Sequence, residues 1–135
     1  MWSHKKFLEA CSKLKEAGHR PQFNQGDVIA RGYADLGYEE FLLITDQKMV
    51  SLYSGTTSNL PNGHADHFFL VPTHEQMVEE IGRRGGDIVA MTYRDQRTWN
   101  LELLLSGGVS REAQGPTIAE ALLQGLTAIV GEKRA

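Results

Sequence analysis

The sequence has one cysteine and no apolar run long enough to cross a membrane as a helix. With Cys11 alone, an internal disulfide is excluded, and so is any zinc or redox motif built on several cysteines. The segment from Met1 to Lys6 leads into a charged helix instead of an apolar signal core. We therefore expect a soluble, cytoplasmic protein without a membrane partner, in which Cys11 packs as a small core residue.

The familiar catalytic patterns are also missing. No serine lies in a Gly-x-Ser-x-Gly context, and the Ser54–Ser58 run lacks the lysine of a phosphate-binding loop. No cysteine–histidine pairing can be inferred from sequence alone. The sequence consequently predicts no catalytic residues, and an enzymatic function has no support from motifs.

Length and charge limit the remaining classes. With 135 residues, of which 41% are hydrophobic and 23% charged, the chain can bury one sizeable core, so we expect a single domain over 1–135. The net charge is −3, yet the first twenty residues carry five basic and two acidic side chains. Direct nucleic-acid binding is disfavoured for the whole chain. A local basic face with Lys5, Lys6 and Lys13 is a candidate partner surface, and its alternative is a solvated helix face.

Two capping boxes give the firmest structural prediction. Thr73 is followed three residues later by Gln76, and Thr117 by Glu120, each time before an apolar-periodic stretch. In such a box the threonine hydroxyl accepts from the backbone three residues on, and the longer side chain reaches back to the threonine N–H. Two helices are therefore expected to begin at these threonines.

The pattern of apolar residues predicts the other elements. Helices are expected over 3–17, 73–81 and 117–130, and strands over 27–33, 41–44, 48–53, 68–71, 87–93 and 99–105. The strand over 87–93 looks buried, and long loops are expected over 54–66 and 106–115. This order predicts an α+β fold, with an N-terminal helix and two hairpin-plus-helix halves around an antiparallel or mixed sheet of about five strands. The 54–66 loop is the first place to look for binding, unless it is only a disordered connection.

One cluster has the composition of a metal site. His64, Asp66 and His67 lie close together in the sequence, and His74 follows at the entrance of the capped helix. Two imidazoles and a carboxylate can hold zinc or another divalent ion with one position open for water. The run resembles a fragment of the metallo-β-lactamase signature His-x-His-x-Asp-His, with Asn62 in place of the first histidine. It implies a small metal-dependent hydrolase or metal-binding regulator; otherwise these are surface side chains and no cofactor is expected.

Two further charged groups are candidate partner contacts. Asp35, Glu39 and Glu40 form an acidic cluster in the sequence, which is either a partner-facing patch or a solvated loop. Arg83 and Arg84 stand among three glycines, where they could present guanidinium groups to a phosphate or simply end the preceding helix.

The C-terminal third carries a resemblance to known groups. From Trp99 to Thr117-Ile118-Ala119-Glu120-Ala121-Leu122 it resembles a strand-then-helix found in small phage and prophage proteins and in HicB-type antitoxin domains, which have a partial ribonuclease-H-like fold. The lack of a catalytic set, together with the long polar loop, the acidic body and the basic first helix, favours a non-catalytic regulator that binds a larger protein or ribonucleoprotein, such as an anti-CRISPR-like inhibitor of host defence or an antitoxin. A structural or assembly protein is the other alternative, and a homodimer could form through an exposed hairpin edge.

Overall fold

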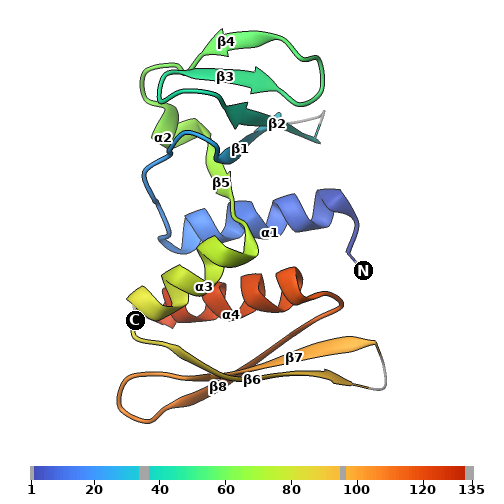
Figure 1. Ribbon diagram of the computed structural model, residues 1–135, viewed down its shortest axis with the longest axis vertical. Coiled ribbons are helices and arrows are strands. Elements are labelled where there is room, and N and C mark those ends of the chain that lie inside the picture. Colours follow the sequence, from blue (N-terminus) through green and yellow to red (C-terminus); the bar gives the residue numbers. More distant parts are fainter. Residues whose placement is uncertain (1, 34–36, 95–96, 133–135) are drawn as a thin grey trace. The chain divides into compact units, whose positions relative to one another are not determined.

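The chain divides into two compact units in the computed structural model, which describes residues 2–33, 37–94 and 97–132 (Figure 1). The inserted unit is the continuous segment Arg20–Pro72. The split unit combines Met1–His19 with Thr73–Ala135, the segments on either side of it. The expectation of a single domain stays a prediction.

The inserted unit is built on an antiparallel sheet of five strands in the order β4-β3-β2-β1-β5. The strands are β1 (Val28–Tyr33), β2 (Gly37–Leu43), β3 (Lys48–Ser51), β4 (Thr57–Asn59) and β5 (Phe69–Val71). A single helical turn, α2 (His64–His67), lies between β4 and β5. Strands β4 and β5 form the two edges of the sheet. The residues of β4 are polar and exposed, so this edge faces water.

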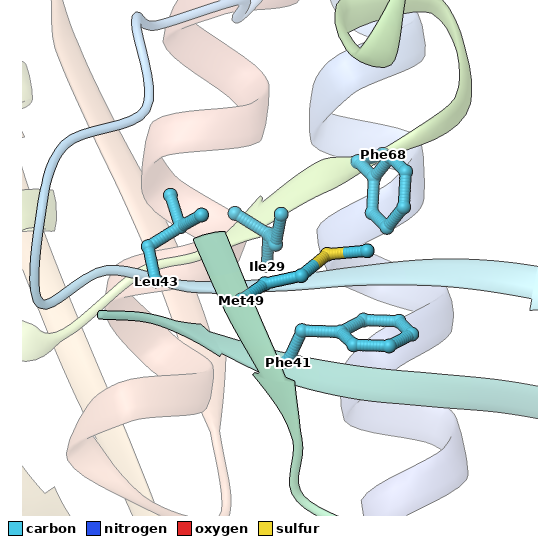
Figure 2. Close-up of a cluster of buried hydrophobic side chains, with 5 residues drawn as sticks. All are labelled: Ile29, Phe41, Leu43, Met49 and Phe68. Carbon is cyan, nitrogen blue, oxygen red and sulfur yellow. The ribbon is translucent and has the colours of Figure 1, made fainter. Parts of the chain in front are cut away.

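Five apolar side chains form the core of the inserted unit (Figure 2). They are Ile29, Phe41, Leu43, Met49 and Phe68. The register pairs Ile29 with Phe41, and strand alternation places these side chains on one face of the sheet. Phe41 and Phe68 meet edge to face at 5.7 Å between ring centroids. This apolar face is the support on which the polar groups of the unit are positioned.

The split unit combines three longer helices with a second antiparallel sheet. Its elements are α1 (His4–Ala17), α3 (His74–Arg83), β6 (Asp87–Arg94), β7 (Thr98–Leu104), β8 (Ser110–Gly115) and α4 (Ile118–Glu132), and the strand order is β6-β7-β8. Helix α4 packs on the sheet and also contacts α1 and α3. The approach is close at Gly125, where an added Cβ would lie 2.8 Å from the Leu101 side chain.

Both predicted capping boxes are confirmed. Thr73 Oγ1 accepts from the Gln76 N–H at 3.1 Å, and Gln76 Oε1 accepts from the Thr73 N–H at 2.9 Å. The corresponding pairs between Thr117 and Glu120 measure 3.2 and 3.0 Å. The first helix is also confirmed, between an N-cap at Ser3 and a C-cap at Gly18 with φ 124°.

The α+β class with an N-terminal helix is confirmed, and the strands form two antiparallel sheets. Two segments predicted as loop contain strands instead, β4 at Thr57–Asn59 and β8 at Ser110–Gly115. Both are polar edge strands without apolar alternation, so periodicity does not reveal them. The strand expected over 87–93 is confirmed as β6, but the expectation that it is buried is wrong, because β6 is an edge strand with Val89 61% and Tyr93 55% exposed. None of the helices in the described ranges is long and apolar enough to cross a membrane.

Candidate functional site

The inserted unit carries an open groove with a cavity volume of about 580 Å³, which we call the amide groove. It is lined by four side-chain amides, one acidic group, two rings and two apolar residues: Gln22, Gln47, Asn59, Asn62, Asp46, Phe23, His64, Leu60 and Pro61. Three separate parts of the unit meet here, namely the approach to β1, the β2–β3 turn and the segment from β4 to α2.

Backbone contacts hold these parts together. The Leu60 N–H donates to the Gln47 carbonyl at 2.7 Å and ties the segment after β4 to the β2–β3 turn. In that turn Thr45 Oγ1 accepts from the backbone N–H groups of Gln47 and Lys48 at 3.2 and 3.0 Å. The groove is therefore bounded by hydrogen-bonded backbone and not by side chains alone.

The aromatic wall of the amide groove is a ring pair. Phe23 and His64 lie 5.7 Å apart between centroids, tilted by 42°. His64 Nδ1 is 3.2 Å from the Pro61 carbonyl, so the imidazole is held on its own segment. Phe23 also packs against the apolar core of the unit, which fixes the ring from behind.

The predicted binding loop accounts for one part of this groove. Residues 59–64 belong to the 54–66 segment, where the sequence predicts binding. The sequence does not predict the contribution of Gln22, Phe23, Asp46 and Gln47, because nothing local connects them with that loop. The turn composition at Asp46-Gln47 is the only available sequence signal.

The proposed metal ligands are not brought together as a site. His64, Asp66 and His67 lie on the short turn α2, whereas His74 begins α3 in the split unit. Throughout the described ranges, no group of three or more His, Cys, Asp or Glu side chains is arranged to hold a metal ion. The geometry therefore gives no support to the hydrolytic interpretation of this run.

The predicted acidic cluster is also dispersed. Asp35 lies outside the described residues. Glu39 and Glu40 are successive residues of β2, so their side chains point to opposite faces of the sheet. The register places Glu39 opposite Arg31 and Glu40 opposite Ala30. They do not form one patch.

Glu39 instead belongs to a directional hydrogen-bond network on the apolar face, which we call the arginine network. Arg31 Nε donates to the Tyr33 hydroxyl at 2.6 Å, and that hydroxyl donates to Glu39 Oε1 at 2.7 Å. Ser51 Oγ donates to the other carboxylate oxygen at 2.8 Å. Hydrogen bonds from Tyr33 and Ser51 lower the pKa of Glu39, whereas burial and the bond to Glu39 raise the pKa of Tyr33. The Glu39 carboxylate is thus ionised and held by hydrogen bonds from Tyr33 and Ser51.

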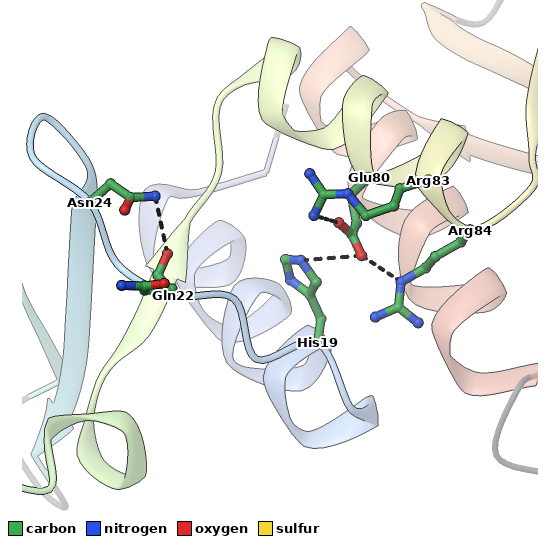
Figure 3. Close-up of polar contacts among 6 residues, drawn as sticks. All are labelled: His19, Gln22, Asn24, Glu80, Arg83 and Arg84. Atoms are coloured by element: carbon green, nitrogen blue, oxygen red, sulfur yellow. Dashed lines mark hydrogen bonds and ion pairs between the residues drawn. The ribbon is translucent and has the colours of Figure 1, made fainter.

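Arg83 and Arg84 are both occupied by one carboxylate in the split unit (Figure 3). Arg83 Nη1 and Arg84 Nε donate to Glu80 at 2.9 and 2.7 Å, and Glu80 is 8% exposed. His19 Nε2 lies 3.9 Å from the same carboxylate. Both arginine pairs are therefore local to the end of α3, which stops at the C-cap Arg84, and Glu80 itself makes the contact with His19 after α1.

This cluster predicts a pH dependence. Burial lowers the pKa of His19 below 6.5, and Arg84 and Arg83 act in the same direction against Glu80. Because the unfolded chain takes up its proton first as the pH falls, the folded state loses stability below pH 6.5. We expect the urea midpoint to fall between pH 7.5 and 5.5, and His19→Gln to remove part of that fall. His74→Gln, an exposed histidine, is the control; an equal effect of both changes would contradict the assignment.

The basic residues predicted as a partner surface on α1 are exposed, and that role stays a prediction. Lys5, Lys6 and Lys13 are exposed on the helix, whose opposite face buries Leu8, Cys11 and Leu14. Lys6 Nζ lies 5.1 Å from the centroid of the Trp2 ring. The prediction that Cys11 is a core residue is confirmed, with 1% exposure.

Comparison with family models, with curated proteins and with solved structures finds no match to this chain.

Proposed function

We propose that this chain is a non-catalytic binding protein that acts by occupying a surface of a larger protein or ribonucleoprotein. The observation that carries the proposal is the amide groove of the inserted unit, with its four side-chain amides beside the Phe23–His64 ring pair. Phage-encoded inhibitors of host defence, anti-CRISPR proteins among them, and antitoxins act in this way. Cys11, which is buried and in no disulfide, is compatible with a cytoplasmic location.

The chemistry of the groove favours a peptide segment as the ligand. Each side-chain amide offers both a donor and an acceptor, which match the N–H and C=O groups of an extended backbone. The Phe23 and His64 rings supply an apolar contact of the kind that anchors one side chain of a bound segment. Asp46 is the only acidic lining residue, so the groove does not select a strongly charged ligand.

The charge of the unit agrees with a protein partner. Residues 20–72 contain three basic and six acidic side chains, so the net charge of −3 resides in the inserted unit. Such a unit repels the phosphate backbone of a nucleic acid. Contact with a ribonucleoprotein would therefore go through its protein component.

A photo-crosslinking experiment tests this proposal. Benzoylphenylalanine replaces Gln47 in the amide groove, or the exposed Glu112 of β8 as the control, in cells that naturally contain the protein. We expect one discrete protein adduct from position 47. Absence of an adduct at position 47, or the same adduct from position 112, would contradict the proposal.

Isosteric variants show whether the amides themselves are used. Asn59→Asp combined with Asn62→Asp keeps the shape of the groove and replaces two amide donors with charges. We expect the adduct to fall about tenfold, because losing one good hydrogen bond at an interface costs about 1.4 kcal/mol. Gln124→Glu, an exposed amide on α4, is the matched control and should leave the adduct unchanged.

A further inference from the structure

The arginine network contains one group whose hydrogen-bonding capacity is not used. Arg31 donates through Nε to Tyr33, and its two Nη atoms donate no hydrogen bond to any residue of the described ranges. Among the described residues, Asn100 Nδ2 is the one buried side-chain nitrogen or oxygen atom without a hydrogen-bond partner. Neither Nη atom of Arg31 is therefore both buried and unpaired. The outer edge of the guanidinium therefore reaches solvent with its parallel donors free.

The guanidinium is held in place by aromatic rings. Its Cζ lies 4.8 Å from the centroid of Tyr33, 5.4 Å from Phe68 and 5.9 Å from Phe41. Phe41 and Phe68 belong to the rigid core of the unit, with 4% and 0% exposure. Stacking of this kind suits the planar, weakly hydrated guanidinium and restricts its rotation.

A chain of hydrogen bonds fixes the remaining degree of freedom. Tyr33 has one hydroxyl hydrogen, which goes to Glu39, so its lone pair must receive Arg31 Nε. Ser51 likewise gives its hydrogen to Glu39 and accepts from the backbone N–H groups of Tyr53 and Ser54. Arg31 is thereby oriented from the backbone of the turn after β3.

We propose that the Nη edge of Arg31 is a binding site for a carboxylate group. Two parallel N–H donors on a fixed plane match the two oxygens of one carboxylate in a bidentate pair. This site lies in the arginine network and does not depend on the amide groove. Tyr33, Glu39 and Ser51 are positioning residues, because they act on the ligand through the orientation of Arg31.

The surrounding charge selects a monoanion over a phosphate. The Glu39 carboxylate is one hydroxyl away from the guanidinium, and it repels any second negative charge on the ligand. The other two basic residues of the unit, Arg20 and Lys48, belong to no part of the network, and the unit as a whole carries −3. A dianionic phosphate would meet this field with twice the charge of a carboxylate.

Three short peptides test the site on the intact protein. The first, acetyl-Ala-Ala-Ala with a free C-terminus, offers a chain-end carboxylate; the second, acetyl-Ala-Glu-Ala-amide, offers a side-chain carboxylate; the third, acetyl-Ala-Ala-Ala-amide, offers neither. The readout is the NMR signal of the Arg31 guanidinium during titration. We expect saturable shifts with the first or second peptide, whichever source the site takes, and none with the third. Equal shifts with the neutral peptide, no shift with either acid, or tighter binding of inorganic phosphate would overturn the proposal.

Two variants separate the effect of the paired N–H donors from that of the positive charge. Arg31→Lys keeps the positive charge but loses the paired donors, and we expect affinity for the carboxylate peptide to fall about tenfold. Tyr33→Phe removes only the hydroxyl that orients the guanidinium, and a smaller fall of about threefold is expected. Arg111→Lys, an exposed arginine in β8, is the matched control. Unchanged affinity of Arg31→Lys for the carboxylate peptide, measured by the NMR signals of the peptide, would also overturn the proposal. If a variant does not fold, the titration of the wild-type protein with the three peptides still tests the site.

Discussion

Gly115→Ala is expected to cause a large loss of stability, although it adds only one methyl group. A Cβ at this position would lie 2.6 Å from the Ala121 backbone nitrogen and 2.8 Å from the Glu120 carbonyl carbon. Backbone atoms cannot rotate away, so the start of α4 must shift off the end of β8. Overpacking of this kind costs about 3 kcal/mol at the upper end of its usual range, which lowers Tm by on the order of 10 °C. Thermal unfolding followed by circular dichroism measures it.

A second glycine gives the matched control. Gly82 lies in α3 with no atom within 4 Å of an added Cβ, and its φ is not positive. Gly82→Ala should therefore stabilise the protein by about 0.5–1 kcal/mol through helix propensity alone. If both substitutions moved Tm in the same direction, the close contact between β8 and α4 would not be what requires glycine at position 115.

Glu120→Ala is the other large effect. Glu120 is 3% exposed, and its two carboxylate oxygens accept from the Thr117 N–H at 3.0 Å and from the Trp2 N–H at 2.9 Å. Alanine leaves both donors without partners at a partly buried position and removes half of the capping box. We expect a loss of about 3 kcal/mol in the free energy of unfolding, measured by urea titration.

The other capping box separates the two parts of this loss. Gln76→Ala removes the same reciprocal bond from Thr73, but at an exposed helix end where water replaces it. It should cost about 1 kcal/mol or less. Glu120→Gln should lose an amount of unfolding free energy between those of Glu120→Ala and Gln76→Ala. Its single amide oxygen can accept from one of the two N–H groups but not both. Equal losses for Glu120→Ala and Gln76→Ala would show that the bond to Trp2 contributes nothing.

The elements that could be predicted from the sequence are those with a local signature. Thr73 and Thr117 predict the starts of their helices, because a capping box is completed within four residues. The apolar faces of α1 and β7 follow from periodicity, as Leu101 and Leu103 illustrate. Strands β4 and β8 lack such a signature, since their polar residues become strands only by hydrogen bonding to β3 and β7. Val89 and Tyr93 mislead the prediction for β6, because β-branched and aromatic residues are frequent in edge and buried strands alike.

The candidate sites are less accessible to prediction. The amide groove requires the β2–β3 turn to meet the segment after β4, a contact between parts of the sequence that share no pattern. The sequence marks Glu39 as a functional candidate, but for its charge and not for its bond to Tyr33. The sequence does not predict a role for Arg31, because a single arginine in a strand has no distinguishing pattern. Only the register, which places it opposite Glu39, shows its partner.

The division of the split unit into two chain segments has a consequence for how the protein emerges from the ribosome. Helix α1 is made first, whereas α4, against which it packs, is made after every strand. The bond between Trp2 and Glu120 joins residues 118 positions apart. The inserted unit can complete its own sheet before α4 exists, but Leu8, Cys11 and Leu14 lack this cover until α4 is complete. Until then the Cys11 thiol, which is 1% exposed in the folded protein, is open to oxidants, and the apolar residues around it are open to chaperones.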